Sequence, residues 1–348
     1  MRTLIEAAKH GEVELVRTLI NEGVDLESMD HIEWTALMWA AERGHSACVE
    51  LLITAKADIN FQTSFGTDAL SVAACHGQHV CLQLLIDAKA EVDSPDVALT
   101  SALTSAALGG YAACVQLLVD AKANLEAKDP LGNPALHVAV REDLGVFFTV
   151  VTEEISKTEN VPRALGGKDK HNHIACARIL IDAKVDIDAR DGEGKTALQW
   201  VAEQGRTSFL QLLINAKAGV DVQDNRGFTA LMYAAVKGQT DCLRLLPATE
   251  SPDRARYEAA QQDHTACVQL LIDAKANLES KSITCRTALM EAAIRGYLTS
   301  VQVLVDAKAD AEAQDDDGKT SLMYAIENGH SACVQVLLHK AVSRGKML

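Results

Sequence analysis

The chain has 348 residues and a net charge of −15, with 48% hydrophobic and 4% aromatic residues. Its acidic field would repel a phosphate backbone, which excludes nucleic acid as a favoured partner. The charge keeps the protein soluble, or it complements a basic surface on a partner. The apolar content is enough for a continuous core, and the scarcity of aromatic residues favours thin layers over one thick core.

Neither the N-terminus nor any apolar stretch predicts secretion or membrane insertion. The first residues, Met1 to Glu6, lack the pattern of a signal peptide. The longest suspicious apolar run, 146–151, is far too short to span a bilayer. We therefore expect a protein of the cytoplasm, with the nucleus as the alternative and no membrane contact.

An Ala-Lys dipeptide recurs along the chain at regular intervals. Its lysines are spaced by 33, 33, 62, 33, 58 and 33 residues and are Lys56, Lys89, Lys122, Lys184, Lys217, Lys275 and Lys308. A fixed period in this range is typical of a solenoid, in which each repeat packs only on its neighbours. The period therefore predicts an array whose function lies on a surface rather than in a pocket. We also expect a monomer.

Each period indicates two short helices and an extended finger, here called helix one, helix two and the finger. In the second unit, Thr35 can cap a helix over residues 36–43, and Gly44 can end it in the left-handed conformation. Helix two is expected over 46–54 and an extended segment over 56–62. Neither helix is long enough to be stable alone, so each must bury its apolar face on neighbouring layers.

The start of helix one resembles the Thr-Pro-Leu-His-x-Ala signature of ankyrin repeats. It takes the form Thr-Ala-Leu-Met from Thr35, Thr229 and Thr287, and the signature histidine is present as His137. About ten units align over residues 1–348, and their residues at the signature threonine, the cap position, are Arg2, Thr35, Asp68, Ser101, Pro134, Thr196, Thr229, Arg254, Thr287 and Thr320. The resemblance implies an all-α dominated repeat solenoid, an ankyrin-repeat array of helix-turn-helix pairs joined by β-hairpin-like fingers.

The ends and one interior finger depart from the regular unit. The first unit, 1–33, and the last, 319–348, carry more charge than the inner ones, and we interpret them as polar caps of a single array that leaves no room for a catalytic domain. The 58-residue interval is two units less eight residues. Prolines cannot donate ladder hydrogen bonds, so we expect a truncated finger at 247–253 and a notch in the finger row.

The 62-residue interval holds 29 extra residues, which we place at 143–171 between the helices of the fifth unit. Long excursions in compact folds are commonly functional or disordered. In one interpretation its apolar start extends a helix or lies against a neighbouring layer, and the remainder is mobile. In the other it is a recognition arm anchored by Phe147 and Phe148, which would make the chain a regulatory adaptor or inhibitor.

Seven of the nine cysteines occupy one position of the repeat: Cys48, Cys81, Cys114, Cys176, Cys242, Cys267 and Cys333. Leu15, Phe209 and Ser300 fill the same position in other units, so it is mainly a packing position. Successive layers lie about 10 Å apart, from helix-packing distances, which is too far for a disulfide. We expect reduced, buried thiols.

A second cluster contains Cys75, His76, His79 and Cys81. Thiolate and imidazole ligands suit zinc, but the spacing of a structural zinc site is missing. Zinc binding or redox sensing is therefore an alternative of another class, and we expect no metal and no other cofactor.

No nucleophile motif, phosphate loop or paired carboxylates point to an enzyme. The framework repeats while the exposed positions differ between units, as expected where binding resides. We predict a non-catalytic scaffold that binds a partner protein or an extended peptide in a concave groove. The predicted contact residues are aromatic or basic and are Trp39, Phe65, Trp200, Arg226, Phe228, Tyr233 and Tyr324. Packing between layers is the open alternative for the rings on helix one.

Overall fold

The computed structural model describes residues 3–94, 101–129, 131–141, 170–246, 252–274, 277–281 and 285–343. Two compact units make up the chain: unit 1, Met1–Gly192, and unit 2, Glu193–Leu348. Both consist of stacked helix pairs. Within the described residues, β-pairing is limited to one isolated antiparallel bridge, between Lys128 and Pro134. The predicted helical repeat solenoid is confirmed.

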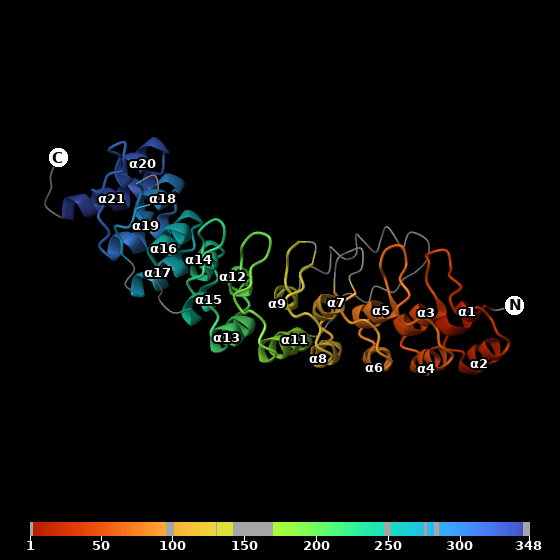
Figure 1. Cartoon of the computed structure of the whole chain (residues 1–348). Coiled ribbons are helices and arrows are strands. Elements are labelled where there is room, and N and C mark those ends of the chain that lie inside the picture. The colour runs from red at the N-terminus through yellow and green to blue at the C-terminus, as the bar shows by residue number, and fades with distance from the viewer. Residues whose placement is uncertain are drawn as a thin grey trace. The chain divides into compact units, whose positions relative to one another are not determined.

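Unit 1 contains five helix pairs among its described residues (Figure 1). The helices one pack on each other in a row and are α1 (Leu4–Lys9), α3 (Ala36–Arg43), α5 (Ala69–Cys75), α7 (Ala102–Leu108) and α9 (Ala135–Val140). The helices two form a second row beside it and are α2 (Val13–Asn21), α4 (Ser46–Thr54), α6 (His79–Asp87), α8 (Ala112–Asp120) and α11 (Lys170–Asp182). The fingers project from the helix-one side, away from the helix-two row (Figure 1).

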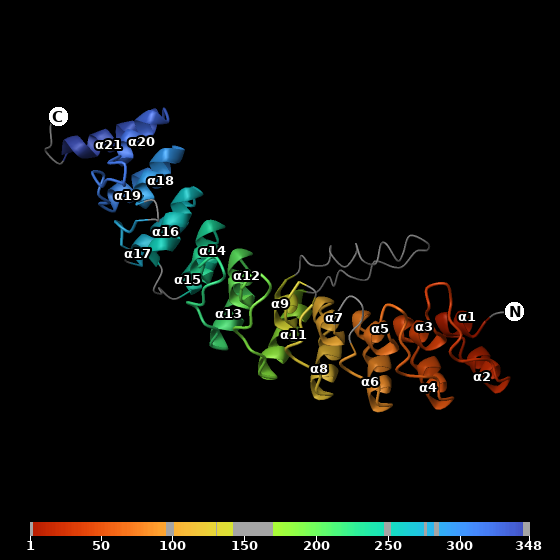
Figure 2. The same cartoon turned by 45° about the horizontal axis from the view of Figure 1, so that its top comes forward.

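Unit 2 repeats this arrangement with five pairs in its described part (Figure 2). Its helices one are α12 (Ala197–Glu203), α14 (Ala230–Val236), α16 (Pro252–Gln261), α18 (Ala288–Arg295) and α20 (Ser321–Glu327). Its helices two are α13 (Thr207–Asn215), α15 (Thr240–Leu245), α17 (Thr265–Asp273), α19 (Leu298–Asp306) and α21 (Ser331–Ser343). The core lies between the rows, where small alanines of helix one, such as Ala234, are completely buried because helices press on them from both sides.

The cap position begins helix one in most units. Thr35 Oγ1 accepts an N–H of the first turn of α3, and the same bond is made by Asp68, Ser101, Thr196, Thr229, Thr287 and Thr320. Two units differ from the alignment. Thr3 caps α1, since the helix starts one position later there. Arg254 lies inside α16, which begins at Pro252, and not at its cap.

The second unit has the predicted helices, Ala36–Arg43 and Ser46–Thr54, joined through Gly44 at φ 75°. The backbone at Gly44 is left-handed, a conformation that favours glycine. A Cβ there would meet the amide end of the Gln78 side chain of the next layer, which would have to shift. Gln78 Nε2 donates to Glu42 O at 2.9 Å, so this turn also links two layers. The equivalent close approach recurs for Gly11 with His45, Gly238 with His264 and Gly296 with His330.

The lysine that follows helix two adopts a left-handed conformation wherever it is described. The φ angles lie between 64° and 71° for Lys56, Lys89, Lys122, Lys184, Lys217 and Lys308. Around Lys56, its N–H donates to Ile53 O and the N–H of Ala57 donates to Leu52 O, the pattern of a Schellman cap. A residue with a Cβ costs on the order of 1 kcal/mol in this conformation, so the chain accepts strain at each of these helix ends.

The two irregular intervals lie between well-defined helices. The fifth unit has α9 before its insertion and α11 after it, and the regular frame is restored at His173, whose ring approaches Gly110 as His45 approaches Gly11. The proposed arm residues Phe147 and Phe148 lie outside the described residues. Between α15 and α16 only six residues intervene, 246–251, and most of the predicted truncated finger also lies outside the described residues.

The cysteine column is buried and unpaired with other cysteines. Burial raises the pKa of Cys81, Cys242 and Cys267 to about 11 and that of Cys114 and Cys176 to about 12. Such thiols stay protonated and poorly reactive at neutral pH.

The zinc alternative gains no support from the geometry. Cys81 lies in the buried column, and His76 Nδ1 lies 2.9 Å from Val72 O in its own helix. Throughout the described ranges, no three His, Cys, Asp or Glu side chains are grouped to hold a metal ion. No helix of the described part is both long enough and apolar enough to cross a bilayer.

Candidate protein-binding surface

Five of the described fingers end in a tight turn that their own side chains hold. In the sixth finger, Asp224 Oδ1 accepts the N–H of Arg226 at 2.9 Å and that of Phe228 at 2.8 Å. The residue five before the cap position makes the same two bonds in other fingers, as Asp30, Thr63, Asp129 and Asp315. Such side-chain bonds favour one turn conformation. The residue three before the cap position, the tip position, therefore has a defined place at the end of the finger.

A second set of bonds ties five of the fingers to the next layer. Glu27 Oε1 accepts the N–H of Asp58 at 2.8 Å. The residue eight before the cap position repeats this bond in other layers: Asn60 with Glu91, Asp93 with Asn124, Glu126 with Asp186, and Glu279 with Asp310. The sequence analysis missed this role, although an acidic or amide residue recurs at that distance from the cap.

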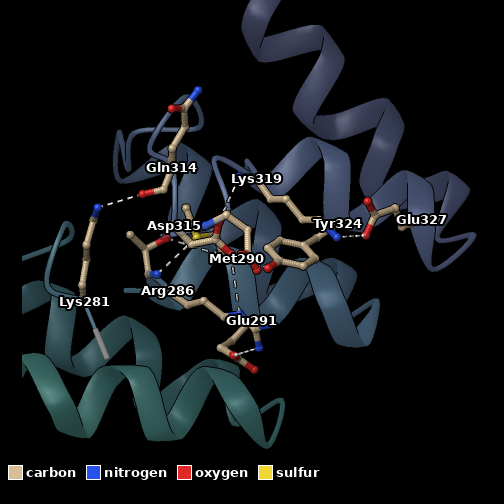
Figure 3. Close-up of polar contacts among 11 residues, drawn as sticks. Lys281, Arg286, Met290, Glu291, Gln314, Asp315, Lys319, Tyr324 and Glu327 are labelled. Carbon is tan, nitrogen blue, oxygen red and sulfur yellow. Dashed lines mark hydrogen bonds and ion pairs between the residues drawn. The ribbon is translucent and has the colours of Figure 1, made fainter. Parts of the chain in front are cut away.

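Side chains six before the cap position also join adjacent fingers. Lys128 Nζ donates to Arg190 O at 2.9 Å in unit 1, and Lys281 Nζ donates to Gln314 O at 2.8 Å in unit 2 (Figure 3). Lysine is therefore structural at these two positions. The described fingers of unit 1 form a connected row, and the eighth and ninth fingers are linked in unit 2. Few conformations of these linked fingers remain to be lost when a partner binds.

The aromatic residues predicted on helix one lie at the base of the fingers. The exposed fraction is 7% for Trp39, 3% for Tyr233 and 6% for Tyr324. Trp39 Nε1 donates to Asp30 Oδ2 at 2.8 Å and Tyr233 OH donates to Asp224 Oδ2 at 2.5 Å, while Tyr324 OH donates to Asp315 in the same way. Each ring therefore supports the turn that begins nine residues earlier. Their predicted contact with a partner stays a prediction.

Cations cover these rings on the finger side. Lys195 Nζ lies 4.1 Å from the ring centre of Trp200, which is half-buried, and 4.7 Å from that of Tyr233. Phe228 is 9% exposed because the guanidinium groups of Arg226 and Arg254 each lie 4.9 Å from its ring centre. A partner approaching this part of unit 2 meets charged groups before it meets aromatic faces.

A cluster at the last two fingers of unit 2 shows how these charges are balanced (Figure 3). Arg286 lies over the Tyr324 ring at 5.1 Å, and its nitrogens lie 3.4 Å from Glu291 Oε1 and 3.8 Å from Asp315 Oδ2. Lys319 lies on the same ring at 5.4 Å. The side chains of Glu291 and Asp315 are nearly buried and Arg286 is about one third exposed, so the cluster fixes where the guanidinium stands on the surface.

The turn aspartates are held as anions. Burial alone would raise the pKa of Asp224, but the hydrogen bonds donated by Tyr233, Phe228 and Arg226 outweigh it and lower the pKa below the ordinary value. The hydrogen bond from Tyr324 is the main cause of a lowered pKa at Asp315. Both carboxylates remain charged at neutral pH, where they accept the bonds that shape the finger.

The tip position differs in chemistry between the two units. In unit 1 it is apolar, with Ile32 half-buried, Phe65 56% exposed and Leu131 46% exposed. In unit 2 it is charged and exposed, with Glu193, Arg226 and Asp317. Phe65 and Arg226 are thus the predicted contact residues that a partner can reach most easily. Sequence analysis missed Leu131, which stands at the same position as Phe65 in the repeat.

Comparisons with known proteins agree with this architecture. A family model described as ankyrin repeats, in three copies, matches residues 4–96, 168–254 and 257–345. The crystal structure of the human ASB11 ankyrin repeat domain is similar in fold, with a TM-score of 0.57 and 23% sequence identity over 72% of this chain and 100% of that one. No curated protein matches. Ankyrin repeats are generally protein–protein interaction modules. With matches over more than half of its length, the chain belongs to the ankyrin-repeat family.

Proposed function

We propose that this protein is a non-catalytic scaffold that holds a partner protein, or an extended segment of one, on the finger side of its helix pairs. The observation that supports this proposal is that the bonds that hold the fingers recur along the chain, whereas the residues at the finger tips differ. The turn residue and the bonds between layers recur from finger to finger. The tip residues they present change from apolar to acidic to basic. Such a surface suits selection of one partner.

A surface suits this chain better than a pocket. An open cleft of about 560 Å³ lies between the second, third and fourth fingers, lined by Gln62, Glu91, Val92, Asp93, Ser94, Ala121 and Lys122. Its lining mixes polar and apolar groups, and the cleft lacks the apolar enclosure typical of small-molecule sites. A linked finger row instead offers a large pre-formed surface, which lowers the entropy lost on binding. We place the protein in the cytoplasm as a monomer.

Affinity capture with matched variants tests the proposal. One variant changes two exposed cations of unit 2: Arg226→Asp at a finger tip, and Lys237→Glu at the end of α14, where the ammonium lies 3.6 Å from Glu203 Oε1. A second variant shortens two tips of unit 1, Phe65→Ala with Leu131→Ala. Arg244→Glu on α15 is the control, since its side chain is 66% exposed on the helix-two side. We expect the wild type and the control to retain the same partners and at least one finger variant to lose them. Equal capture by all four proteins would refute the finger surface.

A further inference from the structure

The finger tips of unit 1 present large apolar side chains to solvent. Phe65 and Leu131 occupy the tip position and expose about half of their surface, and Ile32 occupies it in the first finger. Met29, three residues before Ile32, is 52% exposed. These residues share one position of the repeat, so the exposed apolar groups recur at the ends of successive described fingers of unit 1. In unit 2 no described tip residue is apolar, so the feature is specific to unit 1.

The tip backbones are held in one conformation. The N–H of Ile32 donates to Asp30 Oδ1 at 3.0 Å, and that of Leu131 donates to Asp129 Oδ1 at 2.9 Å. The N–H of Phe65 donates to Thr63 Oγ1 at 3.2 Å. A side chain on a rigid turn loses less freedom on contact than one on a mobile loop. These three tips therefore have the properties of anchors.

The described fingers of unit 1 surround these tips with negative charge. Between the helix-two lysine and the cap position, the first four fingers carry Asp25, Glu27, Asp30, Glu33, Asp58, Glu91, Asp93, Glu126 and Asp129. Lys128 is the cation of the same described segments, and its ammonium group is engaged by Arg190 O. Lys56, Lys89 and Lys122 come at the start of the second, third and fourth fingers, nine residues before the tip position, and the first finger has Gly23 there. A partner that lies across the tips gains from carrying basic groups.

The layer spacing determines the register of such a partner. Packed helices lie 8–10 Å apart, so tips of adjacent layers are about that far apart. An extended or polyproline-II segment advances about 3.1–3.4 Å per residue, or about 10 Å in three residues. Polyproline II also returns to the same face every three residues. Ile32 and Phe65 are one layer apart, and Phe65 and Leu131 two layers apart, which corresponds to partner positions i, i+3 and i+9.

We propose that the tips of unit 1 bind an extended segment of a partner protein that carries apolar side chains at i, i+3 and i+9 and Lys or Arg between them. This inference rests on the proposed function and specifies its partner. Recognition combines the apolar anchors Ile32, Phe65 and Leu131 with the acidic field of the fingers. Because the field acts over a Debye length of about 10 Å, binding should weaken as salt is raised.

The test uses the full chain and a fluorescent peptide, Leu-Lys-Pro-Leu-Lys-Pro-Ala-Lys-Pro-Leu, measured by fluorescence anisotropy at about 50 mM and 300 mM salt. We expect at least about tenfold weaker binding for Phe65→Ala with Leu131→Ala, in keeping with the weight of anchor residues. Leu298→Ala, at a 43% exposed leucine on α19, is the matched control and should bind like the wild type. Circular dichroism verifies that all three chains are folded.

Several results would overturn the inference. One is a scrambled peptide of the same composition that binds as tightly, and another is an unchanged affinity in the Phe65→Ala, Leu131→Ala variant. If a helical peptide with leucines at i, i+7 and i+21 binds more tightly than the extended peptide, the partner segment is helical and not extended. If sedimentation shows that the wild type is a dimer and the Phe65→Ala, Leu131→Ala variant is not, a second copy of this chain covers the tips instead of a partner segment. If the peptide fails while partner capture still depends on the finger variants, the proposed function stands and this inference falls.

Discussion

Replacing Tyr233 by Phe removes one hydroxyl and tests whether the ring supports the finger. Tyr233 OH donates to Asp224 Oδ2 at 2.5 Å, and Asp224 is 6% exposed. A hydrogen bond to a charged group contributes about 1.5–3 kcal/mol, and a buried acceptor left without its donor cannot turn to water instead. The phenyl ring keeps its contacts with Phe228 and Lys195. We therefore expect Tyr233→Phe to destabilise the sixth finger by about 2 kcal/mol.

Hydrogen exchange measures this loss locally, because a repeat array need not unfold in one step. The N–H groups of Arg226 and Phe228 report on the turn, since both donate to Asp224. A loss of about 2 kcal/mol corresponds to roughly 30-fold faster exchange at these amides. In an Asp224→Asn background the same change should cost less, because the acceptor is no longer charged. An acceleration below about threefold at both amides would refute the supporting role of the ring.

The same bond predicts a dependence on pH. The folded-state pKa of Asp224 is lowered, so its contribution to stability is present above the unfolded value, near 3.9, and is lost as pH falls through the folded value. Tyr233→Phe removes one cause of the lowered pKa. The variant should therefore lose protection of the finger at a higher pH than the wild type. Identical acid profiles for the two proteins would contradict this cause.

Three further predictions concern the frame. Lys89→Gly should raise the free energy of unfolding by about 0.5–1 kcal/mol in urea titrations, since it removes left-handed strain, and a decrease would show that the lysine is not strained. Gly44→Ala should lower the free energy of unfolding by about 1 kcal/mol more than Gly23→Ala does. Both glycines have left-handed backbones, but only a Cβ at Gly44 would meet a side chain of the neighbouring layer. Equal losses in the two variants would rule out that contact. In native protein at pH 8, a thiol reagent should modify Cys75 and Cys285 before the buried column, and simultaneous reaction of all thiols would contradict its burial.

Much of the helical frame could be predicted from the sequence because it depends on local signals. Thr35 and Gly44 mark the ends of α3 by capping and by left-handed geometry, and the structure has the predicted range. The cysteine column followed from one position that accepts Cys, Leu15 and Phe209 alike, which indicates packing rather than chemistry. In both cases the evidence lay within one unit or at one repeated position.

The surface could be predicted less well because it depends on contacts that the pattern does not encode. Tyr233 and Phe65 are both aromatic, and both occupy repeat positions whose residue type differs between units. Tyr233 is nevertheless buried under its finger, whereas Phe65 is exposed at a tip. The difference arises at the turn that Asp224 holds. Asp224 Oδ1 accepts the backbone N–H of Phe228, and Oδ2 accepts the hydroxyl of Tyr233, nine residues after Asp224. The pairing of Asp224 with Tyr233 recurs as Asp315 with Tyr324, and a search for that spacing would have found it.

We propose that partners bind on the finger side, at the tips. Hydrogen exchange of the protein alone and in complex with a captured partner tests it most directly. We predict that protection on binding concentrates on the finger turns, around Phe65 and Leu131 in unit 1 or around Arg226 in unit 2. Protection confined to the outer residues of helices two, such as those of α4, α6 and α15, with unchanged exchange in the described fingers, would contradict it.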